Sequence, residues 1–151
     1  IVISEYLRHT DLPWTIVASD ISHRMLEHCR LGIYEVAKVQ LPHSNLLPQY
    51  FLRGIGKRNG FYRVKHELRD HVLVKTINLF QPTYPIQSRQ DVIFCRNVMI
   101  YFDKESRQLL VNKLFEQIHP GGFLFIGHSE SLLGLHHSFC QVGPSVYQRP
   151  A

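Results

Sequence analysis

Cysteine is scarce in this sequence, and long apolar runs are lacking. The 151 residues include three cysteines, Cys29, Cys95 and Cys140, which are an odd number and have no close spacing. This usage argues against a disulfide framework and is typical of a reduced compartment, so we expect a cytoplasmic protein. No apolar run approaches the roughly 20 residues that cross a bilayer, and we therefore expect no membrane insertion.

Patterns typical of metal sites are also lacking, although histidine is plentiful. The ten histidines show no spacing of the HExxH type. His136 and His137 are adjacent, so their side chains diverge on most backbones. Scattered surface histidines explain the composition better than a metal centre, and we expect no metal.

Positive charge exceeds negative charge and is concentrated in one part of the chain. The net charge is +5, which permits nucleic acid, an anionic membrane or an acidic protein as a partner. A solvated basic face is the default explanation for such a cluster. Because no motif for base recognition accompanies it, we do not expect nucleic acid as a partner. The clustered residues are Arg53, Lys57, Arg58, Arg63, Lys65 and Arg69.

The apolar pattern indicates one α/β domain with a sizeable core, since 44% of the residues are hydrophobic. Residues 14–19 form a predicted buried strand that Asp20 closes. Ser22 can cap a following helix, which Gly32 would end. Met25, Leu26 and Cys29 occupy core spacing on that helix.

The second half repeats the alternation of strand and helix. A strand ends at Cys95, and Asp103 can cap a helix that residues 120–122, PGG, would stop before a strand over residues 123–126. Short runs at 139–142 and 146–148 suggest an antiparallel edge. Together these patterns predict a doubly wound α/β sheet. The apolar stripe of the helix consists of Leu110, Val111, Leu114, Phe115 and Ile118.

Residues 46–77 break this alternation and suggest a small antiparallel β insertion. Two strand-like runs, residues 50–53 and 61–64, flank a loop rich in glycine and asparagine. Such an arrangement is typical of a β-hairpin. Residues 68–76 could supply a further strand of the same subdomain.

Polar residues follow several predicted strands, at the sheet edge where parallel α/β folds bind ligands. Arg96 and Asn97 follow the strand that ends at Cys95, although capping of strand and turn is an alternative role for them. Asp20 is placed to accept the hydroxyls of a ribose, or to form a turn. Asn78 could read an adenine edge while Leu79 covers the ring.

These residues resemble the chemotaxis receptor methyltransferases, the CheR family. The resemblance extends in order and rough spacing from Trp14 to Tyr147, and the CRNVxIYF-type stretch is its most specific part. The motifs that carry it are ASDIS at 18–22, Asn78 with Leu79, FCRNVMIYF at 94–102, PGG at 120–122 and GHSE at 127–130.

The resemblance implies transfer of the methyl group of S-adenosylmethionine to glutamate carboxylates on the cytoplasmic region of chemoreceptors, with S-adenosylhomocysteine as product. It implies that Asp20 binds the ribose and that Asn78 and Leu79 hold the adenine. Arg96 and Asn97 would line the cofactor pocket, and Arg96 and Tyr101 would orient the reacting groups.

The β insertion resembles the family's peptide-docking subdomain. By that resemblance, a loop containing Gly54, Gly56 and Gly60 marks members that dock on a receptor's C-terminal pentapeptide. Arg53 and Arg63 would meet the acidic residue of that peptide. The alternative to the enzyme is a non-catalytic module that docks on receptor tails and retains the methyltransferase fold.

The sequence departs from the family pattern at its N-terminal end. The family's N-terminal helical domain and first strand, with its glycine-rich loop, are not found in the sequence. Residues 1–7 resemble the remnant of the helix that follows that loop. We therefore expect residues 1–151 to be a partial catalytic domain that binds S-adenosylmethionine weakly or not at all by itself.

Overall fold

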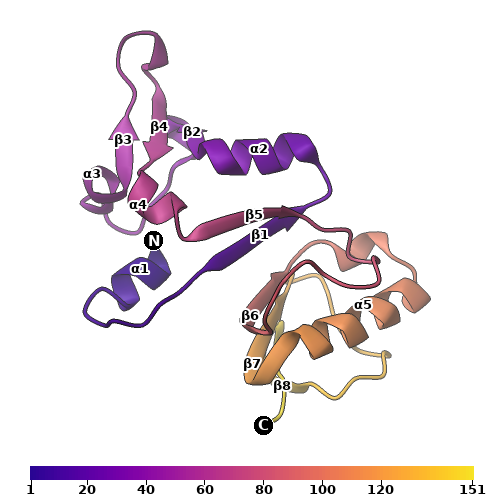
Figure 1. The fold of residues 1–151 in the computed structure, drawn as a ribbon. Coiled ribbons are helices and arrows are strands. Elements are labelled where there is room, and N and C mark those ends of the chain that lie inside the picture. The colour runs from indigo at the N-terminus through magenta and orange to yellow at the C-terminus, as the bar shows by residue number, and fades with distance from the viewer. The chain divides into compact units, whose positions relative to one another are not determined.

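The structure is a computed structural model that describes residues 1–151. Two compact units make up the chain, a first unit of residues 1–78 and a second unit of residues 79–151 (Figure 1). Each unit contains one pair of parallel strands. The architecture is mixed α/β, as the sequence predicts. The strands form three separate sheets, whereas a doubly wound sheet and a small antiparallel insertion were expected.

The first unit is built on a parallel pair of strands, β1 (Ile16–Asp20) and β5 (Val72–Thr76). Helix α2 (His23–Leu31) packs against both strands (Figure 1). The predicted helix boundaries are confirmed. The Ser22 hydroxyl accepts a hydrogen bond from the backbone N–H of Met25, and Gly32 ends the helix in the left-handed conformation at φ 59°.

Only part of the predicted apolar face of α2 is buried. Leu26 is in the core and Cys29 is half-buried, but Met25 is 45% exposed. The prediction that Met25 is a core residue is therefore wrong. The spacing of apolar residues in this nine-residue helix indicates which face points toward the core. How many residues of that face are buried depends on the elements that pack against the helix.

A three-stranded antiparallel sheet forms the rest of the first unit, in the order β2 (Ile33–Glu35), β4 (Phe61–Val64), β3 (Phe51–Arg53). The predicted hairpin is confirmed by the pairing of β3 with β4. Leu46, Tyr50 and Phe51 form a small core beneath it. The short helices and 3₁₀ turns are α1 (Val2–Tyr6), η1 (Val36–Lys38), α3 (Leu46–Tyr50), η2 (Gly56–Arg58) and α4 (His66–Arg69).

The boundaries predicted for the antiparallel strands need correction. Strand β2 precedes the predicted range of 46–77 and pairs with β4, while β5 lies within that range but pairs in parallel with β1. Residues 72–76 therefore do not extend the antiparallel sheet. Alternation of apolar residues identifies a strand, but it does not identify the strand's partner.

The second unit is a four-stranded mixed sheet with one long helix. Its strand order is β6 (Gln90–Cys95), β7 (Ile118–Ile126), β9 (Val146–Gln148), β8 (Cys140–Gly143), with β6 and β7 parallel and the last two strands antiparallel, as predicted. Helix α5 (Lys104–Gln117) connects β6 to β7 and packs on β7. Asp103 caps it by accepting the Ser106 N–H at 2.8 Å. The predicted stripe is confirmed, since Leu110, Val111, Leu114 and Ile118 are buried and Phe115 packs against them.

The PGG segment does not separate helix from strand as predicted. Strand β7 begins at Ile118, before this segment, and pairing with β6 resumes at Phe123. Residues 119–122 thus form a bulge within the strand. Gly122 packs so closely that an added Cβ would lie 2.7 Å from the Asp91 carbonyl oxygen.

None of the helices in the structure has the length and apolar character needed to cross a membrane.

Candidate functional site

Two predicted cofactor residues lie at one edge of the parallel pair in the first unit. Asp20 is the last residue of β1 and is in register with Thr76, the last residue of β5. The Ile77 N–H donates to the Asp20 carbonyl oxygen at 3.2 Å, and Asn78 follows directly as an exposed residue. The carboxyl ends of β1 and β5 therefore present Asp20 and Asn78 together, as the sequence predicts.

The Asp20 side chain is exposed and only partly engaged. Its Oδ1 accepts the backbone N–H of Ser22 at 2.8 Å, which fixes the carboxylate against the start of α2. The other carboxylate oxygen has no hydrogen-bond partner in the structure. An oriented carboxylate with one oxygen available is suited to accept hydrogen bonds from a polar ligand.

The remaining predicted cofactor and catalytic residues lie in the second unit. Arg96 and Asn97 follow β6, and their neighbour Cys95 is in register with Ile126, the last residue of β7. Arg96 and Asn97 are exposed. Tyr101 is 79% exposed at the end of the 3₁₀ turn η3 (Met99–Tyr101).

Leu79 begins the second unit and is the most enclosed of the predicted cofactor residues. Its side chain is half-buried and packs against the core of that unit. The Leu79 carbonyl oxygen accepts the Tyr84 hydroxyl at 2.6 Å. This packing holds Leu79 in place.

A buried carboxylate that the sequence did not identify organises the strand ends of the second unit. Glu130 is 9% exposed, and its side chain accepts four backbone N–H groups. Its Oε1 accepts those of Val98 and Met99 at 2.9 and 2.8 Å. Its Oε2 accepts those of Asn97 and Gly127 at 2.9 and 2.6 Å. Glu130 thus ties the loop after β6 to the loop after β7.

A local signal for this role was present in the GHSE motif. An acid three residues after a turn glycine can bond back to that glycine's N–H, as in a capping box. The Glu130 N–H also donates to the Gly127 carbonyl oxygen at 3.0 Å, so the turn is closed in both directions. The sequence pattern assigned no role to Glu130.

The environment of Glu130 affects the ionisation of two groups. Burial raises the pKa of Glu130, but the four backbone donors outweigh this effect and hold the pKa below its usual value. The carboxylate therefore contributes stability above the usual pKa of a glutamate, and that stability is lost as pH falls through the lowered pKa. Burial, with a smaller effect of Glu130, raises the pKa of the Cys95 thiol to about 11.

Two residues next to this carboxylate have special backbone requirements. Asn97 has φ 58°, a left-handed conformation that asparagine tolerates better than most residues. A Cβ added to Gly127 would lie 2.5 Å from the Asn97 Oδ1 and 2.6 Å from the Glu130 Oε2. Gly127 therefore has no room for a side chain, and the two loops approach each other closely.

The hairpin of the first unit carries the predicted docking residues, and its glycines have internal roles. A Cβ added to Gly54 would lie 1.9 Å from the Arg58 carbonyl oxygen, so the loop closes only without a side chain there. Gly56 and Gly60 have φ values of 58° and 87°. Such left-handed conformations favour glycine.

Strand pairing separates the two predicted docking arginines. Arg53 is in register with Tyr62, whereas Arg63 is in register with Leu52 and Ile33. Paired residues share a face of the sheet and successive residues alternate between faces. Arg53 and Arg63 therefore belong to opposite faces. Arg53 is on the edge strand β3, and Arg63 is on the central strand β4.

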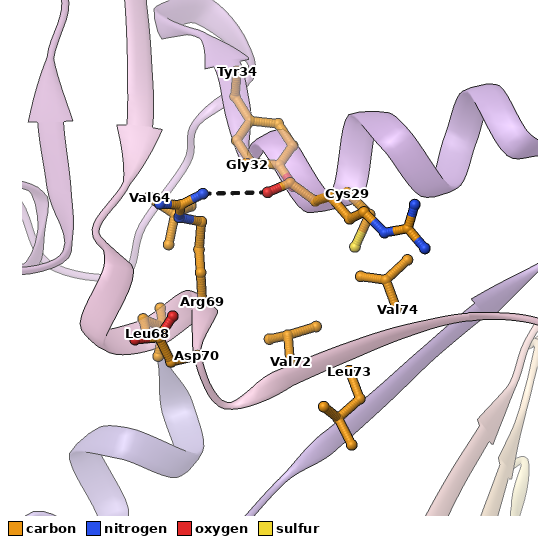
Figure 2. Close-up of a pocket in the computed structure, with 11 residues that line it drawn as sticks. Cys29, Gly32, Tyr34, Val64, Leu68, Arg69, Asp70, Val72, Leu73 and Val74 are labelled. Atoms are coloured by element: carbon orange, nitrogen blue, oxygen red, sulfur yellow. Dashed lines mark hydrogen bonds between the residues drawn. The ribbon is translucent and has the colours of Figure 1, made fainter. Parts of the chain in front are cut away.

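A cavity of about 450 Å³ lies in the first unit, between α2, β4, α4 and β5 (Figure 2). Apolar side chains, among them Val64, Leu68, Val72 and Val74, form much of its wall. Arg69 crosses one side and donates a hydrogen bond to the Arg30 carbonyl oxygen at 3.3 Å. None of the predicted site residues lines this cavity.

Parallel strands with polar residues after their carboxyl ends place the chain in the α/β class, in which ligands bind at that edge of the sheet. Residues 1–147 match the family described as "CheR methyltransferase, SAM binding domain". The chain therefore belongs to the CheR methyltransferase family. The cofactor of this domain is S-adenosylmethionine.

Curated relatives have names that agree with this assignment. The chain is 40% identical over 147 residues to chemotaxis protein methyltransferase 2 of Pseudomonas aeruginosa, which covers 97% of the chain and 52% of the relative. It is 39% identical over 134 residues to the chemotaxis protein methyltransferases of Salmonella typhimurium and Escherichia coli. Those matches cover 89% of the chain and 46% and 47% of the relatives. The chain thus spans about half the length of these relatives.

Proposed function

We propose that this chain forms the cofactor-binding part of an enzyme that methylates glutamate side chains on the cytoplasmic region of chemoreceptors. The observation that carries the proposal is the family match over residues 1–147. The names of the relatives support a role in chemotaxis. The exposed polar residues at the carboxyl ends of the parallel strands supply groups suited to a nucleoside-like ligand.

The donor and acceptor groups of the first unit match the chemistry of the adenosyl part of the cofactor. The Asp20 carboxylate would accept the ribose hydroxyls, and a charge-assisted bond of this kind contributes about 1.5–3 kcal/mol. The Asn78 amide would bond to the adenine edge. In the second unit, Leu79 would cover the ring and Arg96 and Asn97 would line the pocket. The product, S-adenosylhomocysteine, would occupy the same groups.

The proposed reaction needs positioning more than acid–base chemistry. A glutamate carboxylate is already ionised at neutral pH, so no general base is required. When bound, S-adenosylmethionine supplies the methyl group and a sulfonium leaving group. Alignment of the reacting atoms and exclusion of water can lower the barrier by about 7–11 kcal/mol. Arg96 and Tyr101 would orient the carboxylate and balance its charge.

Methyl transfer by the complete protein to receptor-containing membranes tests this function. With radiolabelled S-adenosylmethionine, we expect label in the receptor as a methyl ester that mild base releases as methanol. S-adenosylhomocysteine should inhibit the transfer. Base-stable label would contradict carboxylate methylation, and receptor binding without any transfer would support the non-catalytic docking module instead.

We also propose that the hairpin docks a C-terminal receptor peptide at the β3 edge. A peptide can add as one more strand to an exposed sheet edge, and Arg53 lies on that edge strand. Arg63 lies one strand further in and on the opposite face. Contact with the acidic residue of the peptide is therefore assigned to Arg53.

Substitution of the two arginines separates their roles. We expect Arg53→Ala to weaken binding of an acidic C-terminal pentapeptide about tenfold, because a charge-assisted hydrogen bond is lost. Arg63→Ala serves as the matched control and should change the affinity less than about twofold, as is usual for exposed pairs at a distance. Fluorescence anisotropy with a labelled peptide measures both. Equal losses, or a larger loss at Arg63, would contradict the assignment to the β3 edge.

A further inference from the structure

Glu130 has a bonding pattern that a structural surface glutamate does not need. Its carboxylate is nearly buried and accepts four backbone N–H groups, from Asn97, Val98, Met99 and Gly127. Placing a charge at such a position is costly unless hydrogen bonds satisfy it. Here both oxygens are satisfied by backbone groups alone, so the charge is used to hold the backbone.

The backbone that it holds is the segment that carries the candidate catalytic residues. Three of the four donors are consecutive residues between Arg96 and Tyr101. They lie at the start of the 3₁₀ turn η3, whose first N–H groups have no partner within the turn. The carboxylate therefore caps η3 from another loop, 31 to 33 residues away in the chain.

The bonding also fixes a backbone conformation that is costly on its own. Asn97 has φ 58°, and its N–H is one of the four donors. A left-handed residue persists where the surrounding contacts determine it. The Asn97 N–H belongs to the peptide group that joins Arg96 to Asn97, so this hydrogen bond also fixes the ψ angle of Arg96.

We propose that Glu130 is a positioning residue that sets the geometry of Arg96, Asn97 and Tyr101 for binding S-adenosylmethionine and for methyl transfer. The proposal rests on the function proposed above. Glu130 touches neither cofactor nor substrate in this assignment. It acts through the backbone of residues 97–99 and through the turn at Gly127.

Glu130→Gln in the complete protein tests the inference with little change of shape. The amide offers one acceptor oxygen and one donor NH₂ group, so two of the four backbone N–H groups lose their acceptor whichever way the amide is oriented. Glu116→Gln is the matched control, because Glu116 is an exposed glutamate of α5 in the same unit. Thermal unfolding of both variants checks that each remains folded.

The first measurement is the affinity for S-adenosylmethionine, by calorimetric titration. We expect Glu130→Gln to raise the Kd about tenfold, as for loss of hydrogen bonds to a charged group. The value of kcat for receptor methylation should fall about a hundredfold, as for misplaced reacting groups. The KM for the receptor and all parameters of Glu116→Gln should be unchanged. A purely structural role would reduce the folded fraction, and hence the apparent kcat, without changing the Kd of the folded molecules.

The second measurement does not depend on activity. Hydrogen–deuterium exchange of peptides covering residues 96–101 and 127–130 should be at least about tenfold faster in Glu130→Gln than in the unaltered protein. Unchanged exchange, or an unchanged Kd in a folded variant, would overturn the inference while leaving the proposed function intact. If the unaltered complete protein does not bind S-adenosylmethionine, the proposed function fails and this inference fails with it.

Discussion

Replacing Arg96 with alanine is expected to abolish methyl transfer while the fold is retained. Arg96 is exposed directly after β6, and no hydrogen bond or ion pair of its side chain is found in the structure. Exposed substitutions of this kind change the free energy of unfolding by no more than about 0.5 kcal/mol. Loss of a group that orients the reacting carboxylate should instead lower kcat about a hundredfold or more. Radiolabel transfer to receptor membranes measures the rate.

Two further variants sharpen this result. Arg89→Ala removes an exposed arginine just before β6 and should leave the rate unchanged. Arg96→Lys keeps the charge but loses the planar guanidinium, so it should recover only a small part of the lost rate. Turnover by Arg96→Ala equal to that of the unaltered protein would remove Arg96 from the site.

Substitution of Gly54 by alanine is expected to disrupt the hairpin. The added Cβ would lie 1.9 Å from the Arg58 carbonyl oxygen and 2.8 Å from the carbonyl carbon, which are backbone atoms that cannot move aside alone. The Gly54 N–H also donates to the Phe61 carbonyl oxygen at 2.8 Å. A shift of Gly54 would therefore break this backbone hydrogen bond at the loop end of the hairpin. We expect the free energy of unfolding to fall by about 2–3 kcal/mol and the pentapeptide to lose most of its affinity.

The neighbouring residue provides the control for this substitution. Ile55 is 85% exposed, so Ile55→Ala should leave both stability and peptide affinity close to those of the unaltered protein. Chemical denaturation of the three proteins measures the difference. A Gly54→Ala protein as stable as the Ile55→Ala protein would show that the loop can close in another way.

The stability and the peptide affinity of Gly54→Ala address different questions. A loss of stability tests only the packing of the loop. A loss of peptide affinity tests whether the hairpin is the docking surface. If Gly54→Ala is destabilised yet binds the peptide normally, the peptide docks elsewhere and the assignment of the β3 edge is wrong.

Features that depend on neighbouring residues could be predicted from the sequence. The Ser22 and Asp103 caps, the left-handed Gly32 and the apolar stripe of α5 are all present as expected. Each of them involves residues within a few positions of one another, where backbone geometry and side-chain type determine the outcome. The strand ends that carry the motifs could be predicted for the same reason. A strand and the polar residue that follows it are adjacent in the chain.

Features that depend on distant pairing were decided only by the tertiary structure. Whether β5 joins β1 or the antiparallel sheet, and which faces Arg53 and Arg63 occupy, follow from registers that one strand's sequence does not contain. The role of Glu130 was hidden for the same reason, since three of its four donors are supplied by a loop more than 30 residues away. The amino-acid sequence thus determined which side chains stand at the strand ends and the family to which they point. Folding decided which buried charge holds the residues that follow β6, because a backbone N–H has no side-chain identity for the sequence to reveal.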